Sequence, residues 1–209
     1  MPVTWLHPAA LCLAALLWSG EASPVALQQP AAQPPQASMA GDLLVASSHI
    51  GDPRFWHTVI LLVRQNDQGA MGVVVNRPLG AVPLARLLQA LGLDDSGVKG
   101  TIRIFRGGPV SPAVIFDLHG ASYHDSGTVA IPDGFALTVD PQILEAIAHG
   151  HGPKKNLVAF GYAGWAPGQL QMELARGDWF VIPATATLVF GEPRNRVWDD
   201  AMARRGIQL

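Results

Sequence analysis

The sequence has little charge and almost no cysteine. Of its 209 residues, 14% are charged, against roughly 25% in an average soluble domain. Its 14 Lys and Arg against 16 Asp and Glu leave no positive field for phosphate groups, which disfavours a generally basic nucleic-acid-binding protein. Cys12 is the only cysteine, so no disulfide can form within one chain. With 49% hydrophobic residues, the chain is too apolar to be disordered throughout.

The first part of the chain lacks basic residues, because no Lys or Arg precedes Arg54. Within it, the uncharged run AALCLAALLW (9–18) is about half as long as a membrane-spanning helix and suits the core of a secretory signal peptide. We therefore expect residues 1–22 to be a signal peptide cleaved after Ala22, followed by a Pro/Ala/Gln-rich linker over 23–40. This interpretation predicts an exported, periplasmic protein. The alternative is a true start at Met39, which predicts a cytoplasmic one.

From residue 41 to 209, short apolar runs bounded by turns predict one folded domain. The β-branched run 59–63 is typical of a strand covered on both faces, and with 73–75 it predicts a hairpin. Leucines at helical spacing predict a helix over 83–91. Further strands are expected at 43–46, 102–105, 114–118, 127–131, 135–139, 157–161, 179–182 and 187–190, and further helices at 141–149, 169–176 and 196–205. Short turns between strands exclude a doubly wound parallel sheet, so the prediction is a strand-rich, mixed α+β domain.

Common catalytic motifs are missing from the sequence. It contains no phosphate loop, dinucleotide-binding fingerprint, nucleophile elbow, zinc-protease motif or EF-hand. Cys12 lies in the expected signal peptide, which excludes a cysteine nucleophile in the domain. We therefore predict no cofactor. An enzyme stays open, because catalytic groups are assembled in space rather than in sequence.

Two histidines separated by a glycine are a candidate metal site. A metal could be held by His149 and His151 with a third ligand from His119, His124 or Asp125. The alternative is a polar helix end, where histidine also suits the helix dipole. We favour the helix end and predict no metal.

Two other segments have both a structural and a chemical interpretation. Gly107 and Gly108 either present backbone N–H groups to an anion or form a tight turn between strands, and the turn is favoured. Asp117 and His119 lie two apart on one predicted strand and so face the same side. With Ser111 nearby in sequence, they are the candidate groups of a hydrolase.

The most distinctive segment is GYAGWAPGQL (161–170), which places two aromatic rings and a Gln amide among three glycines and a proline. A loop of this composition between a strand and a helix can form a shallow ligand pocket. Equally, the rings can plug the sheet edge while Gln169 starts the helix. Both interpretations stay open at this point.

Taken in chain order, the motifs of the domain resemble the bacterial YqgE/AlgH family over 41–209. They are GDLLVA (41–46), DPRF (52–55), GAMGVVVNRP (69–78), GGPV (107–110), LHG (118–120), GYAGWxPGQLxxEL (161–174), WFVIPA (179–184) and Trp198. The resemblance implies an α+β fold with a bifurcated sheet and a small barrel-like core, flanked by three to four helices. It implies no established catalytic activity, and some members are described as candidate transcriptional regulators. The motif positions become the candidate ligand-binding residues: Asn76, Arg77, Gly107, Gly108, Gly161, Tyr162, Gly164, Trp165, Gln169 and Glu173.

These observations predict a non-enzymatic regulatory protein that binds an unknown small molecule or protein partner through the loop from Tyr162 to Gln169. One alternative is an uncharacterised hydrolase that uses His119, Asp117 and either a serine or a metal-bound water. Another is a transcriptional regulator that acts indirectly or through weak nucleic-acid binding. Direct DNA binding is disfavoured, because the sequence has no helix-turn-helix signature and no basic face. We expect no transmembrane span in the mature domain.

Overall fold

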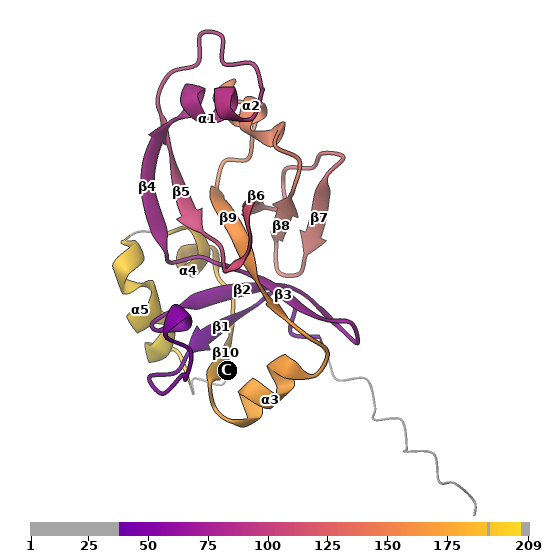
Figure 1. The fold of residues 1–209 in the computed structure, drawn as a ribbon, viewed down its shortest axis with the longest axis vertical. Helices are drawn as coiled ribbons and strands as arrows, with labels where there is room; N and C mark the ends of the chain where they lie inside the picture. The colour runs from indigo at the N-terminus through magenta and orange to yellow at the C-terminus, as the bar shows by residue number, and fades with distance from the viewer. Residues whose placement is uncertain (1–37, 192, 206–209) are drawn as a thin grey trace, which may run out of the picture. The chain divides into compact units, whose positions relative to one another are not determined.

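The computed structural model describes residues 38–191 and 193–205 (Figure 1). The expected signal peptide and the greater part of the expected linker lie outside the described residues. The described ranges contain ten strands, five α-helices and two 3-10 helices. The strands are β1 (Asp42–Ala46), β2 (Val59–Asn66), β3 (Gly69–Val74), β4 (Pro78–Pro83), β5 (Thr101–Arg106), β6 (Val110–Gly120), β7 (Thr128–Ile131), β8 (Phe135–Thr138), β9 (Asn156–Trp165) and β10 (Trp179–Pro183). The helices are η1 (Pro53–Phe55), α1 (Leu84–Ala90), α2 (Ile143–Ala148), α3 (Gln169–Ala175), α4 (Ala186–Phe190), η2 (Arg194–Arg196) and α5 (Val197–Ala203).

All ten strands belong to one curled, mostly antiparallel sheet that forms a half-barrel. Its main path runs β10-β1-β2-β3-β9-β6-β8-β7, and β4 joins through β5, which pairs with β9. The contact between β5 and β9 is parallel. The predicted mixed α+β fold is therefore confirmed.

The predicted hairpin is formed by β2 and β3 and lies inside the sheet, between β1 and β9. Its apolar side chains alternate between two hydrophobic clusters, with Leu61 and Val63 in one and Ile60 and Leu62 in the other. This alternation follows from the two-residue period of a strand. It confirms that the run 59–63 is covered on both faces.

Strand β9 joins the two halves of the sheet (Figure 1). Its first half pairs with β5 and β6, and its last residues pair with β3. Where it passes from one half to the other, Gly161 has a φ of +72°, a conformation that favours glycine. A side chain on Gly108 would overlap the carbonyl group of Tyr162. The glycines therefore allow two backbones to cross in close contact.

Helices cover the sheet from separate sides. In α1 and α2, Leu84, Leu88, Ile143 and Leu144 are buried in a third hydrophobic cluster. The helix α5 packs on β1 and β2, where the Trp198 indole Nε1 donates to the Ala46 carbonyl at 2.8 Å. Figure 1 shows α1 and α2 together near one end of β9 and α3 near the other. Among the described residues, no helix combines the length and the apolar character that a membrane crossing requires.

Two elements differ from the sequence prediction. The expected strand at 187–190 is the helix α4, which begins after Thr185, whose hydroxyl accepts from the Leu188 N–H at 3.3 Å. This fifth helix exceeds the three to four that were expected in the described region. In addition, no strand was expected at 78–83, yet these residues form β4. Because β4 pairs only with β5, its prolines sit on an edge strand, where a missing N–H is tolerated.

Candidate functional site

Two adjoining hollows lie beside the end of β9. The first, here called the α3 hollow, has a volume of about 480 Å³ and is lined by Gly164, Trp165, Gln169 and Glu173. The second, the arginine hollow, has a volume of about 650 Å³ and is lined by Arg77, Arg106, Gly108 and Phe160. Both are also lined by Arg54, Phe55 and Pro109, so they form one groove. Their volumes lie in the range of small-molecule sites.

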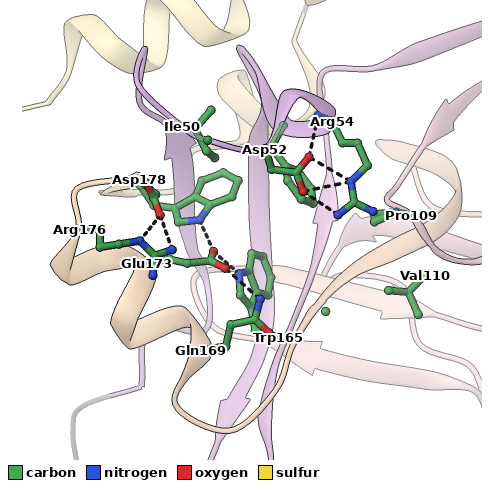
Figure 2. A pocket seen from close by; sticks show the side chains of 14 residues that line it. Ile50, Asp52, Arg54, Pro109, Val110, Trp165, Gln169, Glu173, Arg176 and Asp178 are labelled. Carbon is green, nitrogen blue, oxygen red and sulfur yellow. Dashed lines mark hydrogen bonds and ion pairs between the residues drawn. The ribbon is translucent and has the colours of Figure 1, made fainter.

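The wall of the α3 hollow is built around the carboxylate of Glu173 (Figure 2). One of its oxygens accepts from the indole Nε1 of Trp165 and from that of Trp179, both at 2.8 Å. The other accepts from the amide of Gln169 at 2.9 Å. We call these four side chains the Glu173 cluster. Three directed donors fix the carboxylate, so the wall of the hollow is rigid.

The Glu173 cluster gives two residues of the 161–170 loop a structural role. Trp165 is only 7% exposed and packs edge-on against Trp179, with 6.0 Å between ring centroids. Gln169 is the first residue of α3, and its side-chain oxygen accepts from the Ala166 N–H at 3.0 Å. Both residues therefore hold the structure together while one side of each faces the hollow.

Asn76 and Arg77 fasten the chain that precedes β2. The Asn76 side chain accepts from the Val59 N–H at 2.9 Å and donates to the His57 carbonyl at 2.8 Å. The Arg77 guanidinium donates to the Trp56 carbonyl and, at 3.3 Å, to the Thr58 hydroxyl. Arg77 also lines the arginine hollow. Asn76 instead lines a separate hollow of about 480 Å³, which Arg77 shares.

The remaining predicted residues support the crossing of β9. Gly107 donates its N–H to the Phe160 carbonyl at 2.8 Å, and Gly161 lies against the Gly108 carbonyl. The ring of Tyr162 packs edge-on against Phe116, with 5.8 Å between centroids. Gly107, Gly161 and Tyr162 line neither hollow of the groove. The structure thus brings six of the ten candidates to the groove, namely Arg77, Gly108, Gly164, Trp165, Gln169 and Glu173.

Sequence reasoning missed two arginines of the groove. Arg54 lies in the DPRF motif and forms an exposed ion pair with Asp52, with 2.6 Å between Nη2 and Oδ2. The hydrogen bonds from Arg54 lower the pKa of the Asp52 carboxyl below its usual value. Arg106 directly precedes the GGPV motif and is exposed. Both stand beside quoted motifs, but nothing in their spacing indicates that their side chains meet.

The Asp117 and His119 pair is buried in the sheet, remote from the groove motifs. Both side chains are fully buried. The His119 Nδ1 donates to the Gly120 carbonyl at 2.9 Å, and its Nε2 lies 2.9 Å from the Thr138 hydroxyl. Burial lowers the pKa of the His119 imidazole. Ser111 is at the other end of β6, where Val110 pairs with Tyr162, while His119 pairs with Asn156. These two partners are six residues, roughly 20 Å, apart along β9, so the three groups do not form a hydrolase site.

Asp117 is an unusual carboxyl group. Its Oδ1 accepts from the Asn156 amide at 3.1 Å, while its Oδ2 has no hydrogen-bond partner among the residues that the structure describes. Burial raises the pKa of this carboxyl to about 7, and the hydrogen bond from Asn156 opposes the rise. Asp117 lines neither hollow of the groove.

The candidate metal ligands do not converge. Within 38–191 and 193–205, no group of three His, Cys, Asp or Glu side chains is placed to hold a metal ion. His149 instead ends α2, and its N–H donates to the Glu145 carbonyl at 3.0 Å. This position agrees with the interpretation as a polar helix end.

Comparisons with known proteins agree on one family. The family model described as AlgH-like matches residues 43–209. A UPF0301 protein of Methylococcus capsulatus is 43% identical over 173 residues, which cover 83% of this chain and 94% of that protein. The solution structure of the AlgH protein from Pseudomonas aeruginosa has a TM-score of 0.69 at 36% identity and covers 85% of this chain and 94% of its own. A crystal structure of a Corynebacterium diphtheriae protein, at 21% identity and a TM-score of 0.64, shares the fold over 84% of this chain and 91% of that one.

Proposed function

The chain belongs to the AlgH-like family, and from this premise we propose that it is a non-enzymatic binding protein whose ligand occupies the groove beside β9 and α3. Binding there would serve regulation rather than catalysis. The observation that carries the proposal is the meeting of sequence-distant motifs at one groove. Residues of the DPRF, NRP, GGPV and GYAGW motifs all line it.

The construction of the groove suits a binding role. The Glu173 cluster supplies a rigid wall, so binding requires little ordering of side chains, which favours affinity. Phe55, whose ring packs edge-on against Trp179 with 5.6 Å between centroids, and Val110 add apolar area to the lining. A groove of apolar area with a few directed polar groups is typical of a ligand site.

Gly164 offers a way to test the site. It is exposed within β9, and a Cβ placed on it would lie 3.2 Å from the Tyr162 Cε2 and 3.7 Å from the Val110 Cγ2. A larger side chain there projects beside Val110 into the α3 hollow without a strained φ. Gly164→Leu should therefore occupy part of the α3 hollow and keep the fold, with a small shift of the Tyr162 ring.

The test is a fragment screen followed by amide chemical shifts. We expect fragments that bind to shift the amides of Gly164 and Gly108 and to leave those of α1 unchanged. Gly164→Leu should abolish binding in the α3 hollow, while the matched control Gly164→Ala retains it and both variants melt as the parent does. Fragment binding that moves only amides outside the groove, or binding in the α3 hollow that is unchanged by Gly164→Leu, would contradict the proposal.

The compartment in which the protein acts is the subject of a separate proposal. We propose that the leader at 1–22 directs export, since its apolar run has the length of a signal core. Sequencing the amino terminus of the mature protein would test this. A mature protein that begins at Ser23 supports export, and one that begins at Met39 contradicts it.

A further inference from the structure

The arginine hollow has an unbalanced charge. Three guanidinium groups line it, from Arg54, Arg77 and Arg106, and no Asp or Glu does. They come from three different segments of the chain. Cations that converge on a hollow without a neutralising carboxylate favour an anionic ligand.

The structure holds Arg77 and Arg106 next to each other. The backbone N–H of Arg106 donates to the Arg77 carbonyl at 2.9 Å. Arg77 uses its Nη2 toward the Trp56 carbonyl and the Thr58 hydroxyl, which orients the guanidinium and leaves its Nη1 and Nε free to donate. The Arg106 guanidinium has no hydrogen bond or ion pair with the described residues. One oriented and one uncommitted guanidinium therefore belong to neighbouring residues that line the same hollow.

Arg54 adds a third cation at the boundary with the α3 hollow. It is ion-paired with Asp52, which lines the α3 hollow, and the Arg54 side chain is 67% exposed in this pair. Exposed ion pairs contribute little stability, so a ligand anion can compete with Asp52 for the guanidinium.

Apolar side chains make up much of the remaining lining of the arginine hollow. Phe160 is the register partner of Arg106 across the parallel pair β5 and β9, which places the ring beside this cation. Leu79 is 50% exposed and lines the same hollow with Val74. Apolar surface beside guanidinium groups is complementary to a molecule with an apolar body and one anionic end.

We infer that the arginine hollow binds a small organic anion, with a carboxylate or phosphate group held by Arg77 and Arg106 and an aromatic or aliphatic body against Phe160 and Leu79. The inference rests on the proposed function and specifies its ligand class. A hollow of about 650 Å³ suits a molecule of this size rather than a folded partner.

Four probe compounds, measured by titration calorimetry, separate the parts of this inference. 1-Naphthyl phosphate and 1-naphthoate carry both the body and the anion, 1-naphthalenemethanol carries the body alone, and inorganic phosphate carries the anion alone. We expect at least one of the two naphthyl anions to bind at a single site, and the better of them identifies the anionic group. The neutral alcohol and inorganic phosphate should each bind about tenfold more weakly or not at all.

Arg106→Gln tests the cation directly. Loss of its charge-assisted hydrogen bond should weaken the naphthyl anion by about tenfold or more and leave the neutral alcohol unchanged. Arg86→Gln, which removes an exposed arginine on α1, is the matched control and should have no effect. Added salt should weaken binding of the anions to the parent protein.

The outcomes distinguish this inference from the proposed function. Neutral fragments that bind in the groove, together with naphthyl anions that fail to bind or that are insensitive to Arg106→Gln, overturn the anion inference and leave the binding function standing. Absence of any binding in the groove, in the fragment screen as well as with the four probes, overturns both.

Discussion

Two carboxyl groups, one near each end of β9, differ in the number of hydrogen bonds that they accept. Glu173, beside Trp165, accepts three hydrogen bonds from two indoles and an amide. Asp117, beside Asn156, accepts one, and its second oxygen has no partner among the described residues. Hydrogen bonds to the charged form stabilise a carboxylate, while burial without them destabilises it. The comparison teaches that Glu173 is fixed by donors on both of its oxygens, whereas burial without such donors favours the neutral acid at Asp117.

The largest expected effect is the loss of the Glu173 carboxylate. Glu173→Ala leaves two indole N–H groups and one amide without their acceptor, which should lower the free energy of unfolding by about 3–5 kcal/mol. Chemical denaturation measures it. The control Glu145→Ala, which loses one exposed bond from the Asp94 N–H, should cost less than about 1 kcal/mol. Similar losses for the two variants would show that the Glu173 cluster has no special importance.

Asp117→Asn should act in the opposite direction and depend on pH. Burial raises the pKa of the Asp117 carboxyl to about 7 in the folded protein, against about 4 in the unfolded chain. The protonated carboxyl therefore contributes its full stability below about pH 4, and this contribution is lost as the pH rises through 7. The amide is neutral throughout and can still accept from Asn156. At about pH 8 the variant should therefore be more stable than the parent by roughly 2–4 kcal/mol.

The same comparison at about pH 4 is the control for Asp117→Asn, since the acid is then mostly protonated and the gain should largely vanish. Titration of His119 affects both proteins alike: its lowered pKa costs stability as the pH falls below about 6.5. The difference between parent and variant isolates Asp117. An equal difference at both pH values would contradict the assignment of a neutral acid.

A smaller loss is expected for Gln169→Ala. Glu173 keeps both indole donors but loses the hydrogen bond from the Gln169 amide, and the Ala166 N–H loses its side-chain acceptor. The free energy of unfolding should fall by about 1–2 kcal/mol. Gln171→Ala, on the same helix and without a side-chain hydrogen bond in the described chain, should cost less than about 0.5 kcal/mol. If Gln169→Ala costs no more stability than Gln171→Ala, the Gln169 amide does not contribute to the Glu173 cluster.

The smallest expected effect is that of Asn156→Ala on the titration of Asp117. Loss of the hydrogen bond from the Asn156 amide should raise the pKa of Asp117 further, by less than about one unit. The pH at which the free energy of unfolding declines should rise by the same amount. Unfolding measured across the pH range follows this change. In the Asp117→Asn background the effect of Asn156→Ala should be independent of pH, and a persistent pH dependence there would point to another group.

The sequence predicted elements whose signal is local and long enough. The run 59–63 is a strand and the leucines of 83–91 form α1, because each pattern covers most of its element. The run at 187–190 failed because β-branched residues over a single turn do not distinguish a strand from a helix. The missed strand β4 shows that proline excludes a central strand but not an edge.

The candidate site was predicted where its residues are close in sequence. Gly164, Trp165, Gln169 and Glu173 stand within one motif and do line one hollow. Arg106 was missed because it reaches the groove through the pairing of β5 with β9, which no local pattern encodes. The same holds for the direction of a side chain, since Tyr162 in the same motif packs on Phe116 instead.

The position of β9 late in the chain has a consequence for synthesis. Gly72 in β3 pairs with Ala163 of β9, and Phe105 in β5 pairs with Ala159 of β9. Neither half of the sheet can therefore be completed until β9 has been synthesised, after most of the domain. Until then the open edges of β3 and β5 are exposed to pairing with other chains. Closure of such distant contacts is slow compared with hairpin formation. The nascent protein therefore depends on protection of these edges, and a pause in translation before residue 156 should favour its aggregation.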